Sequence, residues 1–245
     1  MKRVKTCAIL VLTVVFTAFA APAKSPVRVG VVLSGAGMMD GSEISEAVLT
    51  ILALEKAKAN IIFMASNVNQ AKVVNHMTNA DAAEQRNVLV ESARISRGNV
   101  KDIKDVKSAD LDAIVLVGGL GSVLNLSDFM AKGADCTVNA DLSRLVTELN
   151  ASKKPVGSMC LASANLGKIL GSKKVVVTIG GNGSDFVKSL TAMGAVNKEC
   201  AATDIIFDQA NLVVTTPAMM VGASTPDLAT GIEKMINKVI ELTGK

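Results

Sequence analysis

Short runs of β-branched and other apolar residues recur along the chain, separated by segments with helical spacing of apolar residues. Four of these runs span Val27–Leu33, Ile61–Ala65, Ala113–Val117 and Pro155–Met159. Runs that are apolar at nearly every position are typical of strands buried on both faces, as in parallel sheets. Amphipathic helices are expected over residues 42–58, 86–96, 139–151, 161–170, 185–193 and 226–242. Alternation of this kind predicts a doubly wound α/β fold, with a mostly parallel sheet and helices on both faces.

The remaining segments are less regular. Val175–Ile179 is predicted to be a further apolar strand, and Val100–Lys107 a solvated edge strand or connector. Ile205–Asp208 and Leu212–Thr216 flank a short polar turn, which predicts a small β-hairpin near the C-terminus. Residues 67–85 are polar and lack a clear periodicity, so we expect a loop there.

The composition argues against several classes of function. Half of the 245 residues are apolar (49%), which is enough for one substantial core, and we expect a single domain over residues 24–245. Aromatic residues make up 2% of the chain, without Trp or Tyr, which argues against platforms that stack on bases or sugars. Three of the basic residues behind the net charge of +4 are Lys2, Arg3 and Lys5. The rest of the chain holds 23 basic and 22 acidic residues. This balance makes nucleic-acid binding an unfavourable interpretation.

Residues 1–23 have the pattern of a secretory signal peptide. A segment with three basic residues precedes the apolar run Cys7–Phe19, and small residues offer cleavage sites that end at Ala20 or Ala23. The apolar run is short for a membrane span, so no stable span is expected after cleavage. We predict export to the periplasm; the alternatives are an uncleaved anchor and a cytoplasmic protein with an added N-terminal segment. Mass spectrometry of the native N-terminus distinguishes these three cases.

No motif for a nucleotide, another cofactor or a metal is found in the sequence. The Gly-rich loop Ser34–Ser42 has the spacing G-x-G-x-x-D-G, and the second strand ends in Ala65-Ser66-Asn67, without the acid that holds a ribose. A Gly-Lys-Ser/Thr phosphate loop is also missing. The three cysteines after the leader fit neither a disulfide framework nor a CxxC metal site, and their odd number leaves at least one thiol free. We therefore predict no cofactor and no metal.

The stretch Lys154–Ala164 ends an apolar run abruptly in Cys160. Ser158 and Ala162, both small, stand two positions to either side, and a helix-compatible segment follows. This is the pattern of a nucleophile elbow, a sharp strand-to-helix turn that lifts a reactive side chain above a sheet. Unpaired N–H groups and the dipole at a helix N-terminus favour the thiolate. The alternative is an inert buried cysteine, because free cysteines are among the most buried residues.

Three loops are expected to meet at one edge of the sheet, because doubly wound folds bind ligands beyond the carboxyl ends of their strands. They are Ser34–Ser42 after the first strand, Gly118–Ser122 after the third, and the elbow at Cys160. Glycines in the second loop let backbone N–H groups approach a ligand, although a plain tight turn is the alternative. The N–H groups of Gly119 and Leu161 are the candidates to hold an oxyanion.

Two acids, Glu43 and Glu46, lie in the opening turns of the helix that follows the Gly-rich loop. A carboxyl close to a thiolate in a low-dielectric pocket has a raised pKa, so it can stay protonated and donate to sulfur. It can then shuttle a proton for a carbonyl substrate that the thiolate attacks. The alternative, and the commoner role for such acids, is complementarity to the helix dipole.

Several segments, in order along residues 29–245, carry a resemblance to one known family. They are Leu33 to Gly35, Asp40 to Ile44, Glu46 to Leu49, Arg86 to Leu89, Gly118 to Gly121, Asn125 to Ser127, Cys136 to Val138, Met159 to Ala162, Val214 to Ala218 and Glu241 to Lys245. In these segments the chain resembles the DJ-1/PfpI superfamily. Within it the chain is similar to the ES1/ElbB branch of isoprenoid-biosynthesis-protein-like, class I glutamine-amidotransferase-like proteins.

The resemblance implies a flavodoxin-like fold and a homodimer. It also implies a nucleophilic Cys160 with Glu46 as its partner acid; Glu43, one helical turn earlier, is the second choice. The branch is associated with conversion of glyoxal to glycolate, and related members with repair of glycated proteins. In both reactions the thiolate adds to an aldehyde-derived carbon, and a proton shift followed by water releases a hydroxy acid. Ser34, Gly35 and Asn125 are further candidates for residues that line the pocket.

The chain departs from the superfamily in its histidines. Members often carry a histidine beside the cysteine or further along the chain, and here Leu161 and Thr178–Gly180 stand at these places. A locally built Cys-His-Asp triad is therefore missing, which weakens an assignment as a protease or amidotransferase. The only histidine of the sequence, His76, either reaches in from its loop or is a surface or structural residue.

Two functions of different kinds fit these patterns. The first is a cofactor-independent glyoxalase or deglycase that acts on small dicarbonyl or glycated substrates through Cys160. The second is a non-catalytic or redox-sensing binding protein, because a thiolate beside a carboxyl is also prone to oxidation. An accessory role in isoprenoid metabolism rests on the family label alone.

Overall fold

Seven strands form the central sheet, in the order β10-β11-β7-β6-β1-β2-β5. The computed structural model describes residues 25–245, so the predicted signal peptide over residues 1–23 lies outside the described residues. All neighbours in this sheet are parallel except the edge strand β10, which is antiparallel to β11. The strands span Arg28–Leu33 (β1), Asn60–Ala65 (β2), Lys101–Asp102 (β5), Ala113–Leu116 (β6), Val156–Met159 (β7), Ile206–Asp208 (β10) and Val213–Thr216 (β11).

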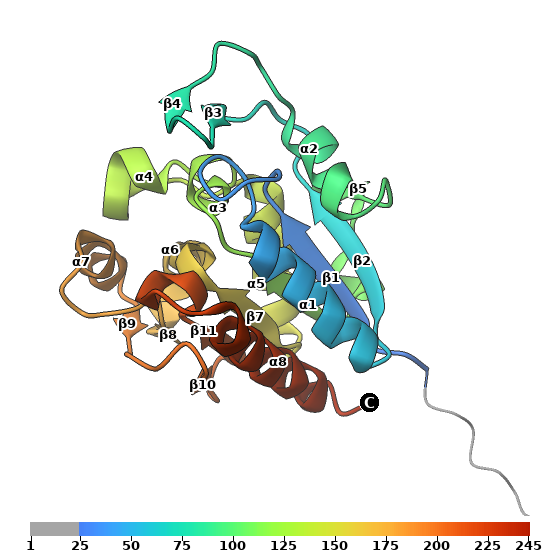
Figure 1. The fold of residues 1–245 in the computed structure, drawn as a ribbon. Helices are drawn as coiled ribbons and strands as arrows, with labels where there is room; N and C mark the ends of the chain where they lie inside the picture. Colours follow the sequence, from blue (N-terminus) through green and yellow to red (C-terminus); the bar gives the residue numbers. More distant parts are fainter. Residues whose placement is uncertain (1–24) are drawn as a thin grey trace, which may run out of the picture.

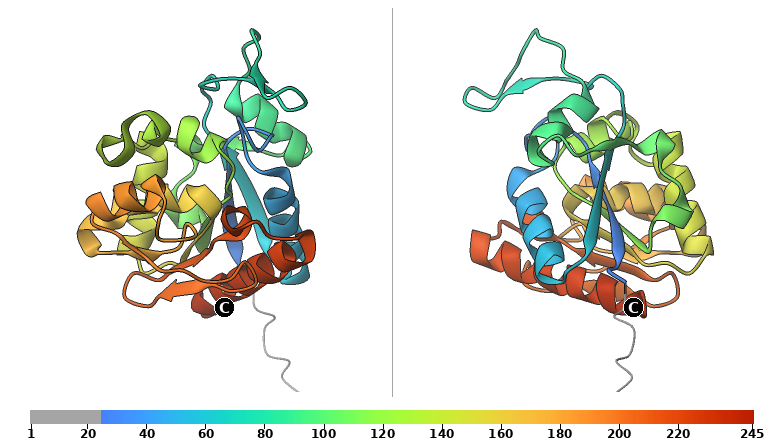
Figure 2. Two further views of the ribbon diagram at one scale, coloured as in Figure 1. Left: turned by 60° about the vertical axis from the view of Figure 1, so that its left-hand side comes forward. Right: turned by 90° about the vertical axis from the view of Figure 1, so that its right-hand side faces the viewer.

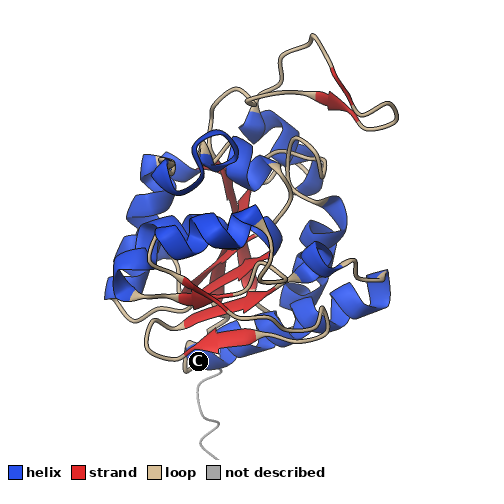
Figure 3. Ribbon diagram, turned by 90° about the vertical axis from the view of Figure 1, so that its left-hand side faces the viewer, coloured by secondary structure: helices blue, strands red, loops and turns tan. Residues whose placement is uncertain are grey.

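Helices cover both faces of the sheet, as predicted (Figure 3). One face carries α1 (Ile44–Lys56), α2 (Val88–Ile95) and α8 (Thr225–Leu242), and the other carries α5 (Ala140–Ala151), α6 (Ser163–Leu170) and α7 (Asp185–Ala192). The residues of β1 explain why both faces need a cover. Val31 and Leu33 belong to the core under α1 and α8, whereas Val32 belongs to the core under α5 and α6. A strand that is apolar on both sides is stable only between two layers of helices.

Besides α1, four of the longer helices begin at a side-chain cap. Asn87 caps α2, Asn139 caps α5, Ser184 caps α7 and Ser224 caps α8, each by accepting a hydrogen bond from a backbone N–H of the first turn. A cap of this kind contributes about 1 kcal/mol to helix stability. These local signals explain why the predicted boundaries of the four helices agree closely with the structure.

The strand predicted at Val175–Ile179 is present in a shorter form, but it does not join the central sheet. Its core, β8 (Val176–Val177), pairs with β9 (Val196–Asn197) in a separate two-stranded sheet. The place beside β7 is taken by β11, and a side chain satisfies the end of β8, since Thr178 N donates to Thr215 Oγ1 (2.9 Å). A short apolar run is compatible with either position, so its pattern could not decide between them.

The two hairpins within residues 25–245 differ in how well they were predicted. The C-terminal hairpin is present as β10 and β11, but β11 is also a full member of the central sheet. The loop predicted over residues 67–85 contains a second hairpin, formed by β3 (Val74–Asn75) and β4 (Ala80–Asp81). This segment projects from the body of the molecule, as Figures 1 and 2 show, and residues 67–86 are called the arm below.

The remaining short elements cluster in the connections. They are two one-turn helices, α3 (Gly121–Leu124) and α4 (Phe129–Lys132), and six 3-10 turns: Ile103–Asp105, Ser108–Asp110, Gly133–Asp135, Cys160–Ala162 (η4), Gly171–Lys173 and Ala218–Val221 (η6).

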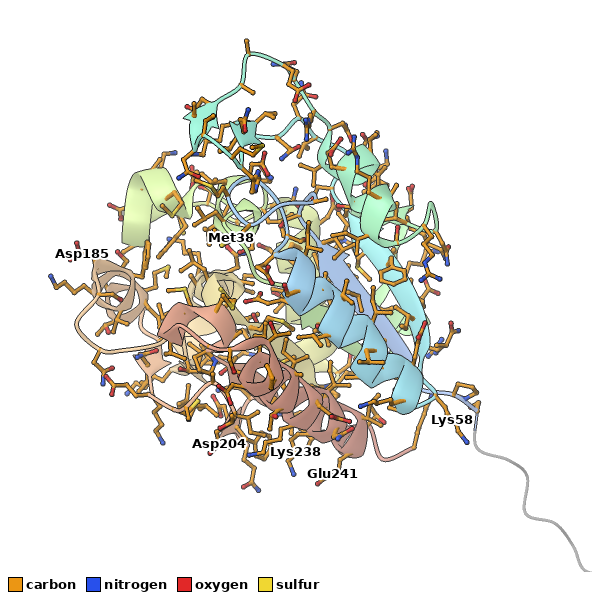
Figure 4. All side chains as sticks on the ribbon, viewed as in Figure 1. Met38, Lys58, Asp185, Asp204, Lys238 and Glu241 are labelled. Carbon is orange, nitrogen blue, oxygen red and sulfur yellow. The ribbon has the colours of Figure 1, made fainter. Side chains whose placement is uncertain are left out.

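The carboxyl ends of β1, β6 and β7 meet at one edge of the sheet. From β1 the chain turns to β2 on one side, while β6 lies on the other side, so this edge holds a topological switch point. The loops after β1 and β6 contact each other there: Glu43 N donates to Gly118 O (3.0 Å), and Gly121 N to Gly41 O (2.9 Å). In Figure 4, Met38 marks this edge of the molecule. It is the place where doubly wound folds bind ligands.

Candidate active site

Cys160 lies at a sharp turn between β7 and α6. The strand ends at Met159, and η4 leads directly into the helix. The backbone of Cys160 has a φ of 54°, in the left-handed region that is strained for a residue with a side chain. The residue is only 6% exposed. A strained strand-to-helix turn with the reactive side chain at its apex has the geometry of a nucleophile elbow.

Glu46 lies in the first turn of α1 and is fully buried beside Cys160. Its Oε1 accepts a hydrogen bond from Met219 N–H (3.4 Å). Its Oε2 has no hydrogen-bond partner of normal geometry among the described residues and faces Gly118. A Cβ atom at position 118 would collide with both Glu46 Oε2 and Cys160 Cβ. The missing side chain of Gly118 is therefore what lets the carboxyl and the thiol approach each other.

Burial determines the protonation of this pair. Burial, together with the charge of Glu43, raises the pKa of Glu46 from its ordinary value of 4.5 to about 8. Burial and the charge of Glu46 also raise the pKa of the Cys160 thiol well above its usual value, while the N–H groups of Gly119 and Leu161 act in the opposite direction. At neutral pH the Glu46 carboxyl is therefore mainly protonated, and it can donate its proton to a charge that forms on the sulfur.

Glu43 has a different role from Glu46, although the two acids are one helical turn apart. It is the N-cap of α1, and its Oε2 accepts a hydrogen bond from Glu46 N–H (2.6 Å). A carboxylate at this place complements the helix dipole, which is the alternative role predicted for these acids. Glu43 is half-buried, whereas Glu46 is buried against the thiol.

The pocket candidates Ser34, Gly35 and Asn125 hold the Gly-rich loop in place. Asn125 Nδ2 donates to Ser34 O (2.9 Å) and to Asp40 O (2.8 Å). Gly35 N donates to Ser92 Oγ on α2 (3.0 Å). These polar atoms are engaged inside the protein, so they position the start of α1 and with it Glu46.

His76 lies on the arm and contacts the Gly-rich loop. Its Nδ1 is 3.0 Å from Val74 O, and its Nε2 accepts a hydrogen bond from Met39 N–H (3.2 Å). Asp40 Oδ1 is 3.9 Å from the same Nε2. Both ring nitrogens thus have partners, one in the arm and one in the Gly-rich loop. This favours a structural role for His76 over the role of a base for the thiol.

Met219 contacts the pair and was missed in the sequence analysis. It belongs to η6, directly after β11, and its N–H is the donor to Glu46 Oε1. The sequence did hold a signal for a site residue at this place. Residues 214–218, directly before Met219, form one of the segments that match the family, and they end at the carboxyl edge of the sheet. The contact itself joins positions 173 residues apart, and no local pattern reports a contact of that range.

Comparison with known proteins identifies the family. The chain is 38% identical over 227 residues to the mitochondrial ES1 protein homolog of Rattus norvegicus, across 89% of this chain and 85% of the relative. The chain belongs to the ES1 family. An isoprenoid biosynthesis protein with an amidotransferase-like domain from Ehrlichia chaffeensis matches this ES1-family chain with a TM-score of 0.83 and 34% identity, over 88% of this chain and 99% of that one.

More distant structures share the fold of this ES1-family chain. A ThiJ/PfpI domain protein from Brachyspira murdochii has a TM-score of 0.51 and 15% identity, over 87% of this chain and 98% of that one. The predicted similarity to the ES1/ElbB branch is confirmed, structures of DJ-1/PfpI proteins share the fold, and the flavodoxin-like fold class is confirmed. No family model matches the chain. Within residues 25–245, none of the helices combines the length and the apolar character that crossing a membrane requires.

Replacing Glu46 with Gln should change the pH dependence of stability. The pKa of Glu46 is raised from 4.5 to about 8 on folding, so folding favours the protonated carboxyl. The stability that this proton provides is fully present below the unfolded value and is lost as the pH rises through the folded one, at ~1.4 kcal/mol per pH unit. Relative to wild type, the free energy of unfolding of Glu46→Gln should rise between pH 4.5 and about 8. Above that range the difference between the two proteins should stay constant.

Denaturant unfolding at a series of pH values measures this difference. Glu241→Gln, at an exposed position on α8, is the matched control and should follow the wild-type curve. A difference between wild type and Glu46→Gln that is constant with pH would contradict the raised pKa of Glu46.

Proposed function

We propose that this ES1-family chain is a cofactor-independent glyoxalase-type enzyme that converts glyoxal-type dicarbonyls to hydroxy acids, and glyoxal to glycolate in the simplest case. One observation carries the proposal: a buried carboxyl that is protonated at neutral pH lies against a thiol on a strained turn, with two N–H donors on the sulfur. This arrangement combines a nucleophile, a proton donor and stabilisation of negative charge.

The proposed reaction begins with addition of Cys160 Sγ to one aldehyde carbon. A C–S bond forms as the carbonyl electrons move to oxygen, the S–H bond breaks, and the thiol proton reaches that oxygen by way of the Glu46 carboxyl, which gives a hemithioacetal. The C–H bond on this carbon then breaks and its proton adds to the other carbonyl carbon, while the hydroxyl proton of the hemithioacetal passes to the second carbonyl oxygen. The first carbon is thereby oxidised to a thioester and the second is reduced to a CH₂OH group, so no external oxidant or reductant is needed.

Water completes the proposed cycle. It attacks the thioester carbon, the C–S bond breaks, and glycolate leaves together with one proton while the thiol is restored. The N–H groups of Gly119 and Leu161, which favour charge on the sulfur, are suited to hold the oxyanion of this step. Glu46 is the group that moves protons between the two carbons, because it is the titratable side chain that lies against the thiol.

Amide hydrolysis is a less suitable activity for the same site. A cysteine that cleaves amides needs a base on the nucleophile. Here the ring nitrogens of His76 are engaged by Val74 and Met39, and the neighbour of the sulfur is a mainly protonated acid. An activated aldehyde accepts a thiol nucleophile without such a base, since a proton donor on the oxygen assists the addition.

Replacing Cys160 with Ala should abolish conversion of glyoxal to glycolate, because the C–S bond can no longer form. Glu46→Gln should lower kcat by roughly 10²- to 10⁴-fold, since a side-chain amide cannot shuttle the proton. Turnover of glyoxal, measured by the appearance of glycolate, tests both changes. Cys200→Ala, which removes another free thiol, should leave the rate unchanged.

Two outcomes would contradict the proposed enzyme. One is full activity in folded Cys160→Ala, with circular dichroism as the check on folding. The other is a wild-type protein without aldehyde turnover. If Cys160 in that protein converts readily to the sulfinic acid under mild peroxide, the redox-sensing binding protein becomes the better assignment.

We also propose that the chain forms a homodimer through the exposed face of α1. Ile44, Val48 and Leu52 follow one another at intervals of four residues, and they are 51%, 53% and 46% exposed. Residues at this spacing share one face of a helix, and an apolar stripe of this kind marks an interaction surface. An adjoining groove of about 310 Å³ is partly lined by Phe63 and Ile95. Figure 1 shows α1 at the front of the molecule, beside α8.

Introducing charge into this stripe should produce a monomer. The double variant Val48→Arg/Leu52→Arg places two like charges at the proposed contact, which is destabilising across a symmetric interface. Size-exclusion chromatography with light scattering measures the mass. Val196→Arg, at an exposed apolar position on β9, is the control and should remain dimeric. A monomeric wild type, or a dimeric double variant, would contradict the proposed interface.

A further inference from the structure

The charged groups with the largest effect on the pKa values of the candidate pair are acids. Glu43 acts on the Glu46 carboxyl, and Glu46 acts on the Cys160 thiol. The opposing influences come from the N–H groups of Gly119 and Leu161 on the thiol and from hydrogen bonds on the carboxyl, not from a cationic side chain. Neither acid takes part in an ion pair within residues 25–245.

The contacts of Glu43 fix this acid at the edge of the site. Its carboxylate accepts the N–H of Glu46 (2.6 Å), and its own N–H donates to Gly118 O (3.0 Å). The backbone on the other side is close as well, because a Cβ atom at Gly119 would collide with Glu43 N. Since Gly119 N–H reaches the Cys160 sulfur, the Glu43 charge is held next to the loop that binds the thiol.

Three exposed apolar side chains come from segments next to the candidate pair. Met38, whose carbonyl accepts a hydrogen bond from Leu120 N–H (2.7 Å), is 48% exposed and lies at the carboxyl edge (Figure 4). Met219 and Val221 of η6 are 37% and 41% exposed. These side chains bring no positive charge to balance an incoming anion. Low-dielectric walls also strengthen the field of a fixed charge relative to its field in water.

We propose that the site selects its carbonyl substrate by charge. Neutral and cationic carbonyl compounds enter, carboxylate- or phosphate-bearing ones are excluded, and Glu43 is the specificity-determining residue. This inference rests on the proposed function for the identity of the substrate, but the charge selection is a property of the Cys160 site itself.

Charge selection of this kind also separates product from substrate. A dicarbonyl enters without charge, and the reaction converts it to a hydroxy acid that ionises at neutral pH. The product carboxylate then stands beside Glu43 and is repelled. Release is thereby favoured, and the hydroxy acid should be a poor inhibitor of its own formation.

A pair of alkylating reagents tests the selection without relying on turnover. Iodoacetamide and iodoacetate transfer nearly the same two-carbon group: the Cys160 S–C bond forms, the C–I bond breaks, and iodide leaves. One reagent is neutral and the other is an anion. The rate of each at Cys160 is followed by mass spectrometry in the full-length protein and divided by its rate with a small free thiol. We expect the normalised rates to favour iodoacetamide by about tenfold at physiological salt.

Two variants assign the effect to one residue. Glu43→Gln keeps an oxygen that can cap Glu46 N–H but removes the charge, and it should reduce the preference for iodoacetamide several-fold. Glu55→Gln removes the same charge from an exposed position twelve residues along α1, roughly 18 Å away. That distance exceeds the ~8 Å Debye length at physiological salt, so the preference should be unchanged. Any change in thiol reactivity affects both reagents alike and cancels in the ratio.

Equal normalised rates in wild type would overturn the proposal, and so would identical ratios in Glu43→Gln and Glu55→Gln. Turnover adds a second comparison, between a 2-oxoaldehyde with a terminal carboxylate and its methyl ester. Conversion of both at the same rate would overturn charge selection while leaving the proposed enzyme intact. Conversion of neither would overturn the proposed enzyme, and the alkylation ratio would still decide the charge selection.

Discussion

The close approach of a buried carboxyl to a thiol across Gly118 is the interaction on which the rest of the site depends. It requires a glycine between the two groups, since a Cβ atom there would collide with both. It also requires the carboxyl to be without charge for most of the neutral range, because burial raises the pKa of Glu46 to about 8. Two negative charges would repel each other strongly in a site that is buried from water. Protonation of Glu46 removes this repulsion, because it neutralises one of the two groups.

The surrounding loops hold the pair in this geometry. Asn125 binds the carbonyls of Ser34 and Asp40, so the Gly-rich loop is tied to the segment after β6. His76 ties the arm to the same loop through the N–H of Met39. The loop in turn leads into the cap of α1, and Glu46 lies in its first turn. Asn125, Ser34 and His76 are candidates for ligand binding in the sequence, but in the structure they act mainly by positioning Glu46.

The same arrangement narrows the chemistry. An acid next to a nucleophile assists addition to a carbonyl, whereas cleavage of an amide requires a base in that place. The charged groups that act most strongly on the pair are carboxyl groups, and this is the basis of the proposed exclusion of anions. Together these features are the basis on which we propose small neutral aldehydes as substrates and carboxylates as products.

Local patterns in the sequence determined the helix boundaries, the buried strands, the elbow at Cys160 and the nearby acids, because each depends on neighbours a few residues away. The choice of Glu46 over Glu43 came from the family resemblance. The tertiary structure decided the rest. It placed β8 outside the central sheet, brought Met219 to Glu46 from 173 residues away, and engaged His76 in the arm. Contacts of this range depend on how the layers pack, and packing sums many weak interactions that no single stretch of the chain records.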